Sequence, residues 1–316
     1  MFAVYKRELK AYMSNVYGWL FMAVLLLFFG FMVFIENLLS MYPNIEYALL
    51  DSEYVLLLMI PILCMRSMAE DKRNKTDMFY LSLPLRTSSV VMGKYLALVT
   101  VFALPCAVMG VYPLVLGLFG KVNFLGGYVS LLFFFLLGAA LIAVCQFLSA
   151  LTDNLVVAAV LGVMACVVLY FLPLLTGILP DAAIVSFIGF VVLALLAAGI
   201  AFLVTRDVTV TTIVGAVLVI PLSVVYMVTS SSFRGLLPVV LEQLAPFMHF
   251  EQTANYGLFS IPSLILLLSY PVFFLFLTVQ AADKYGVGNK DVDAIATHIF
   301  NHLSDCINNV PNVKGG

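Results

Sequence analysis

The chain has 316 residues, of which 64% are hydrophobic and 10% are charged, and its formal net charge is −2. Soluble domains have about 25% charged residues, which help to cover their surface. The composition therefore excludes a soluble globular protein and indicates that lipid surrounds much of the chain. The sequence has no GxxxxGK[ST], HExxH or GxSxG motif. It is therefore not expected to bind ATP itself or to hydrolyse a substrate.

Residues 1–15 are predicted to form an amphipathic helix. Apolar side chains recur along one arc at helical spacing, namely Phe2, Tyr5, Leu9 and Met13, and cations occupy the other arc, namely Lys6, Arg7 and Lys10. This pattern is typical of a helix that lies in the membrane interface with its cations toward headgroups or a partner. A frayed leader is the alternative.

The rest of the chain is predicted to be an all-α polytopic membrane protein with about eight transmembrane helices. A helix rises about 1.5 Å per residue, so about 20 apolar residues cross the hydrocarbon core. The predicted spans are Tyr17–Leu39, Ser52–Ala69, Tyr95–Phe119, Phe124–Ala150, Leu155–Leu179, Ala183–Thr205, Val208–Thr229 and Ile261–Ala281. Six spans, with residues 183–229 as re-entrant segments, are the alternative.

The cations predict the orientation. Threading eight spans from a cytoplasmic N-terminus leaves only Lys121 and Arg234 outside, out of fifteen Lys and Arg residues. The positive-inside rule then places both termini in the cytoplasm. Residues 66–94 form the main cytoplasmic loop, which holds Arg66, Lys72, Arg73, Lys75, Arg86 and Lys94.

The predicted transmembrane domain of residues 1–285 contains one external segment and is followed by a tail. Residues 230–260 are an external segment too broken by proline to span, which fits either short helices or a packed loop. Residues 286–316 form a cytoplasmic tail with an amphipathic helix candidate. His298 and His302 lie four apart in that tail; they could hold a zinc ion or stay solvated or facing a partner.

The chain resembles permease subunits of the ABC-2 type transporter family, in the branch with the gliding-motility and copper-processing permeases. The matching residues are the leader 5–9, Arg66, residues 69–73, Thr76, Pro84, Gly93, Lys94 and residues 249–251. Lys75 stands where the family typically has glycine, and Met78 stands where it has glutamate. The resemblance covers nearly the whole chain.

The resemblance implies two paired permease subunits, identical or different, driven by two cytoplasmic ABC ATPase subunits that use ATP. The loop after the second span would form a coupling helix in a groove of the ATPase. Its contact residues would be Glu70, Asp71, Lys72, Arg73, Thr76, Met78, Phe79, Leu81 and Pro84. Their charges and apolar side chains suit such an interface, although they would also suit a solvated loop.

The expected protein is thus a non-catalytic permease of the bacterial cytoplasmic membrane. Export is favoured over import because nothing in the sequence indicates docking of a substrate-binding protein. Its partners would be the ATPase, a second permease subunit and the lipid bilayer, without nucleic acid or a cofactor of its own. The alternatives are a stand-alone secondary carrier or channel, a membrane enzyme, or an ATPase-linked scaffold that transmits force.

Overall fold

The computed structural model describes residues 1–74, 87–180, 182–205, 208–228, 233–257 and 259–283 and is helical throughout, without strands, in those ranges. Seven of the described helices are long and apolar enough to cross a membrane. An eighth, α11, contains the shorter apolar stretch Thr211–Met227. The predicted polytopic all-α class is confirmed.

The helices follow one another through short connections. Their bounds are α1 Phe2–Ser14, α2 Val16–Val33 with the π-helix η1 Phe34–Leu39, α3 Glu46–Cys64, α4 Ala69–Arg73, α6 Thr87–Met109, α7 Tyr112–Leu116, α8 Phe124–Leu151, α9 Leu155–Ile178, α10 Ala183–Thr205, α11 Val208–Val228, α12 Leu236–Gln243 and α13 Pro246–Tyr256. The helix Ile261–Asp283, here called the final span, follows α13.

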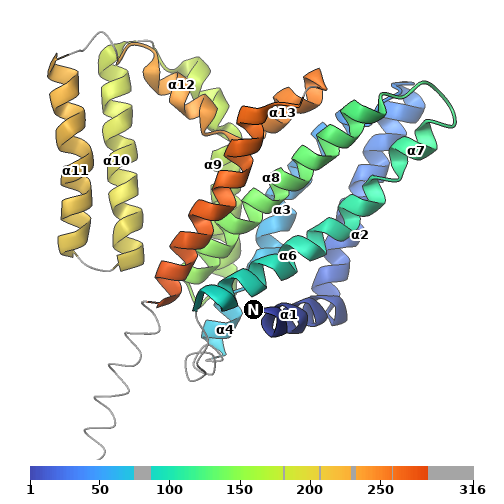
Figure 1. The fold of residues 1–316 in the computed structure, drawn as a ribbon, viewed down its shortest axis with the longest axis horizontal. Coiled ribbons are helices and arrows are strands. Elements are labelled where there is room, and N and C mark those ends of the chain that lie inside the picture. Colours follow the sequence, from blue (N-terminus) through green and yellow to red (C-terminus); the bar gives the residue numbers. More distant parts are fainter. Residues whose placement is uncertain (75–86, 181, 206–207, 229–232, 258, 284–316) are drawn as a thin grey trace, which may run out of the picture.

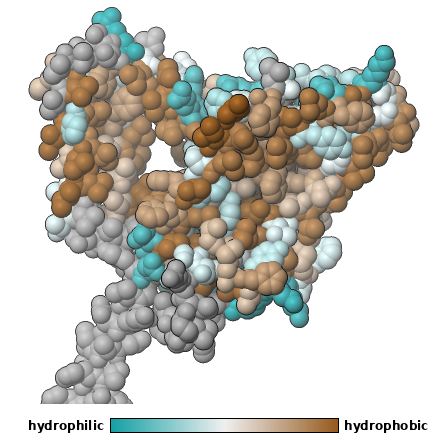
Figure 2. All heavy atoms as spheres, in the orientation of Figure 1, coloured by the Kyte–Doolittle hydropathy of each residue, from teal (hydrophilic) through white to brown (hydrophobic). Residues whose placement is uncertain are grey.

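The bundle has two distinct ends (Figure 1). The short helices α1 and α4 lie at one end, called the leader end, where the final span also finishes. The short helices α7, α12 and α13 lie at the other, called the α13 end. Hydrophobic residues dominate the sides of the helices between these ends, on the face that Figure 2 shows. This distribution suits helices whose sides face lipid.

Helix α8 is the centre of the bundle and packs against α3, α6, α9 and α13. Its side chains Phe133, Phe134 and Leu137 are completely buried. The ring of Phe102 from α6 stacks on Phe135 at a centroid distance of 5.9 Å. A helix that is apolar all round belongs in the interior of a bundle, and α8 occupies that place.

The small residues Ala158, Gly162 and Cys166 on α9 pack within the subunit. A Cβ atom at Gly162 would come within 2.9 Å of the Pro61 side chain of α3, so the glycine permits that close approach. The sulfur of Cys166 lies 3.7 Å from that of Cys145 on α8. The stripe therefore joins helices of one chain.

Helices α10 and α11 form a hairpin that stands beside the bundle (Figure 1). They pack on each other, and α10 also contacts α12. With 23 and 21 residues, both have the length of full spans and are not short re-entrant segments. The structure therefore favours the eight-helix arrangement over the six-span alternative.

Two predicted boundaries are wrong. The second span begins at Glu46 and not at Ser52, so an acidic stretch expected in a connection belongs to a helix. The third begins at Thr87 and not at Tyr95, and ends at Met109, with α7 following Pro113 as a separate helix. Glu46 and Glu53 are buried in α3, and Lys94 is buried two turns after the start of α6. Composition alone does not reveal that these charged residues are buried.

The expected external segment 230–260 contains two short helices, α12 and α13. Helix α13 packs on α3, α8 and α9, and its residues Phe247 and Phe250 are buried. Of the two interpretations of this segment, short helices are therefore the one that the structure shows.

Candidate functional site

The leader helix α1 packs against α2 and α6 at the leader end. The hydroxyl groups of Tyr5 and Thr100 on α6 are 3.2 Å apart, and Tyr12 donates to the carbonyl oxygen of Leu63 at 3.5 Å. Burial raises the pKa of the Tyr12 hydroxyl well above its usual value, so it stays a neutral donor. The predicted cations Lys6, Arg7 and Lys10 are exposed, and Phe2 is exposed too, unlike the rest of its predicted arc.

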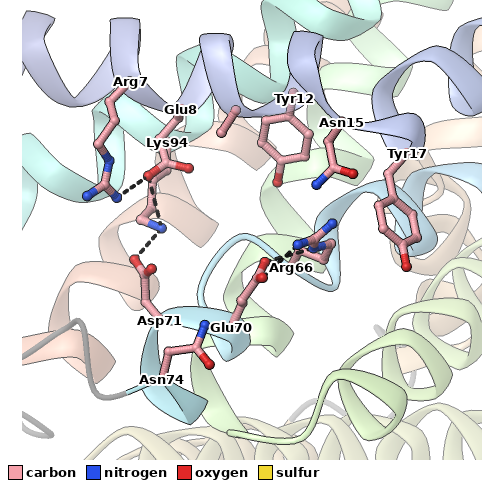
Figure 3. Close-up of a pocket in the computed structure, with 11 residues that line it drawn as sticks. Arg7, Glu8, Tyr12, Asn15, Tyr17, Arg66, Glu70, Asp71, Asn74 and Lys94 are labelled. Carbon is pink, nitrogen blue, oxygen red and sulfur yellow. Dashed lines mark hydrogen bonds and ion pairs between the residues drawn. The ribbon is translucent and has the colours of Figure 1, made fainter.

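A buried ion cluster joins α1, α4 and α6 (Figure 3). We call Glu8, Asp71 and Lys94 the Lys94 cluster. The Lys94 ammonium is only 3% exposed; it lies 2.6 Å from Asp71 Oδ2 and 3.6 Å from Glu8 Oε1. It also donates to the backbone carbonyl of Ser67. A buried ammonium needs such partners because an uncompensated charge away from water is costly.

Gly93 explains how α1 comes close enough to reach this lysine. A Cβ atom at position 93 would lie 3.1 Å from the carbonyl oxygen of Met1 and 3.1 Å from Cβ of Val4. A larger residue would therefore push the first turn of α1 away from α6. Gly93 and Lys94, which precede the predicted third span, thus lie well inside α6. The glycine lets α1 approach, and the lysine pairs with Glu8 of α1.

A second ion pair fixes the link between α3 and α4. Arg66 donates to both carboxylate oxygens of Glu70, at 2.7 and 2.6 Å. Its guanidinium carbon also lies 4.5 Å from the centroid of the Tyr17 ring of α2. Arg66 is therefore held by a carboxylate and by an aromatic ring at once. These contacts restrict the side chains of both Arg66 and Glu70.

Helix α8 holds the start of α4. The Ser149 hydroxyl accepts from the backbone N–H groups of Met68 and Ala69 at 3.2 and 3.1 Å, and donates to the carbonyl oxygen of Met65 at 3.2 Å. Lys72 donates to the carbonyl oxygen of Ala150. Ser149 thus serves as a remote N-cap for a helix that lacks a side-chain cap of its own.

These groups surround a pocket of about 370 Å³ at the leader end (Figure 3). Three cations line it, namely Arg7, Arg66 and Lys94, and three carboxylates line it, namely Glu8, Glu70 and Asp71. The pocket is therefore balanced in charge. Its groups serve to bind segments of the chain to one another rather than to collect a ligand of one charge.

The predicted coupling residues fall into three groups. Glu70, Asp71 and Lys72 face the body of the protein through the contacts above, whereas Arg73 is exposed at the end of α4. The remaining predicted residues lie outside the described ranges: Thr76, Met78, Phe79, Leu81 and Pro84, as well as His298 and His302 of the tail. Within the described residues, no group of three potential metal ligands occurs.

Four contributors to the site were not foreseen in these roles: Glu8, Arg66, Lys94 and Ser149. Arg66 and Lys94 appeared in the family pattern and among the cations of the loop 66–94, but no partner was predicted for either. Glu8 carried a usable signal, because it lies one turn from Tyr5 and Tyr12 on the inward side of α1. A lone Ser149 inside an apolar run carried none.

Comparison with known proteins agrees with this arrangement. Residues 44–186 match the family model described as ABC-2 family transporter protein. The match includes α3, α4, α6, α8 and α9 and ends in the first turn of α10. No curated protein matches the chain. The match does not distinguish branches within that family. The chain is therefore a multi-pass membrane protein in which residues 44–186 match the ABC-2 family transporter model.

Proposed function

We propose that this chain is the permease subunit of an ATP-driven exporter, with the leader end in the cytoplasm. A separate ABC ATPase would bind the segment that begins with α4 and would supply the energy of ATP hydrolysis. The observation that carries the proposal is the attachment of α4 to several helices at once, within the region of the family match.

The contacts of α4 suit a segment that transmits force. Asp71 connects it to α1 and α6 through Lys94, and Glu70 connects it to the end of α3 through Arg66. Ser149 connects its first turn to α8. A displacement of α4 by a partner would therefore reach four helices through buried or half-buried polar contacts. Such contacts are directional and resist sliding more than apolar packing does.

Arg73 is the described coupling residue best placed to meet the ATPase. It is exposed at the C-terminal end of α4, where a cation also suits the helix dipole. Glu70 and Asp71 act inside the chain, so they would support the interface by fixing the position of α4. The cations on the exposed side of α1, Lys6 and Lys10, would face anionic headgroups or the partner.

The full assembly would contain two permease subunits, identical or different, and two ATPase subunits in a bacterial cytoplasmic membrane. At the α13 end, the described segments that connect the spans are short helices. They offer little surface for a substrate-binding protein. Export is therefore favoured over import. The permease would perform no chemistry of its own.

Co-expression of the chain with the ATPase encoded beside it, followed by purification in mild detergent, tests the proposal. The two proteins should co-purify, and Arg73→Ala should lower the amount of ATPase retained. Arg234→Ala, an exposed cation beside α12 at the opposite end of the bundle, is the control and should retain the ATPase like the wild type.

The double variant Glu70→Ala/Arg73→Ala should also lose the ATPase, but by itself it is less informative because Glu70→Ala breaks the Arg66 pair. A cysteine at position 76 or 82 should form a cross-link to the ATPase. Failure to co-purify, together with failure to cross-link along the whole loop, would contradict the proposal.

A further inference from the structure

A network of asparagine side chains at the α13 end joins the end of η1, the start of α3 and the start of α8. Asn37 on η1 donates from Nδ2 to the carbonyl oxygens of Tyr42 and Asn44, at 2.7 and 2.8 Å. The Asn44 side chain accepts in turn from the backbone N–H of Asn123, which precedes α8, at 2.9 Å. We call this region, together with Glu46, the polar junction.

The carboxyl group of Glu46, the first residue of α3, lies against the first turn of α8. A Cβ atom at Gly126 would come within 2.9 Å of Glu46 Oε1 and within 2.7 Å of Asn123 Nδ2. The glycine therefore leaves the space that these two polar groups occupy. The end of α13 lies close by, because a Cβ atom at Gly257 would be 3.8 Å from the Gly126 Cα atom.

Two oxygen atoms of the polar junction are buried and lack a hydrogen-bond partner within the described residues, namely Glu46 Oε2 and Asn37 Oδ1. The two side chains are only 6% and 7% exposed. The Asn37 amide cannot be reversed to hide its oxygen, because Nδ2 already donates to two carbonyl groups. Both free atoms are acceptors, so a donor or a cation must satisfy them.

The Glu46 carboxylate also needs a compensating charge. None of the ion pairs among the described residues includes Glu46, and Lys121, which precedes α8, is exposed. A carboxylate away from water is costly unless a positive charge or a proton accompanies it. A buried water molecule could donate to both free oxygen atoms, but it would leave the charge uncompensated.

We propose that the polar junction binds a monovalent metal cation, for which Na⁺ is the probe. Glu46 supplies one negative charge and Asn37 Oδ1 supplies a neutral oxygen ligand. Hard cations prefer oxygen ligands, and a single carboxylate balances a single positive charge, which favours Na⁺ over Ca²⁺. This site has one ionisable ligand, so it differs from the three-ligand metal groups that the described residues lack. The bound cation fastens the start of α3 to the start of α8.

Thermal unfolding of the purified full chain in detergent tests the site. Replacing N-methyl-D-glucamine chloride with NaCl at constant ionic strength should raise the wild-type midpoint, by about 2 °C for each tenfold increase in Na⁺ above its dissociation constant. Glu46→Gln keeps the shape of the side chain without its charge, so its midpoint should not respond. Glu242→Gln is the matched control and should respond like the wild type, because Glu242 at the same end already accepts from the Thr176 hydroxyl.

Equilibrium binding of radioactive Na⁺ to the same proteins measures occupancy separately from stability. The wild type and Glu242→Gln should bind Na⁺ saturably, whereas Glu46→Gln should not. Gly126→Ala should also lose binding, because its Cβ atom would fill the space beside Glu46 Oε1.

Three outcomes would overturn the proposal. If the wild type binds no Na⁺ and unfolds at the same midpoint in both salts, the junction holds only a proton or water. If Glu46→Gln binds Na⁺ like the wild type, the cation lies elsewhere. If Ca²⁺ stabilises the wild type and Na⁺ does not, the choice of a monovalent cation is wrong. Both experiments use the isolated chain, so their outcome is independent of any ATPase.

Discussion

The two ends of the bundle are both closed by short helices, but the chemistry that fastens them differs. At the leader end, Lys94 lies between Glu8 and Asp71, so opposite charges compensate one another. At the α13 end, His249 lies within hydrogen-bonding distance of Ser263 and of the Gln243 carbonyl oxygen, and the buried Phe250 ring packs against Phe134. Breaking a buried ion pair on one side costs about 3–5 kcal/mol, whereas a hydrogen bond between uncharged groups contributes about 0.5–1.5 kcal/mol. Single polar substitutions should therefore cost more at the leader end than at the α13 end.

Removing the central cation of the leader end should have the largest effect. Lys94→Met keeps much of the side-chain volume but leaves the carboxylates of Glu8 and Asp71 without their shared counter-ion. Breaking a buried ion pair on one side costs about 3–5 kcal/mol. Thermal unfolding of the purified chain in detergent should show a correspondingly lower midpoint.

Lys10→Met provides the control for that measurement. Lys10 lies on the exposed side of α1, so its replacement should change stability by about 0.5 kcal/mol or less. If Lys94→Met and Lys10→Met were equally stable, the Lys94 cluster would not be what holds the leader end together.

A smaller loss is expected at the junction of α4 and α8. Ser149→Ala removes the hydroxyl that accepts from the backbone N–H groups of Met68 and Ala69. Unsatisfied buried donors cost about 1–3 kcal/mol. Ser130→Ala on the same helix is a matched control, because Ser130 is equally buried but its hydroxyl makes no hydrogen bond within the described residues. A similar unfolding midpoint for the two variants would argue against the capping role of Ser149.

At the α13 end, His249→Ala should cost less again. The ring contacts Ser263 and Gln243, but it is only half-buried, so water can replace part of what is lost. Two such hydrogen bonds contribute about 1 kcal/mol together. Gln252→Ala, an exposed neighbour on α13, should unfold like the wild type. Equal destabilisation by the two substitutions would mean that His249 does not anchor the helix.

Much of the fold follows from the sequence because long apolar runs have few alternatives in a membrane. The amphipathic leader and most of the spans were predictable from periodicity and length. For the external segment, the prolines excluded a span but left short helices and a packed loop as alternatives. The starts of α3 and α6 were not predictable, because Glu46 and Lys94 read as residues of a polar loop. Their burial depends on partners distant in the sequence, which no local pattern specifies.

The site was predictable in location but not in geometry. The sequence indicates that residues 70–73 lie in the loop that a partner would contact, and α4 is found there. It does not indicate that Glu70 and Asp71 turn toward Arg66 and Lys94. Opposite charges in a loop are compatible with solvent, with a partner or with each other, and tertiary packing decides among them.

The smallest effect should come from the exposed part of the leader end. Arg7 lies 2.6 Å from Glu8, but its side chain is 56% exposed, so solvent screens the pair. Arg7→Ala should therefore cost only about 0.2–1 kcal/mol. Glu8→Ala should cost clearly more in the same unfolding measurement, because it also removes a partner of the buried Lys94. If the two variants were equally stable, Glu8 would act only at the surface, and Asp71 alone would compensate Lys94.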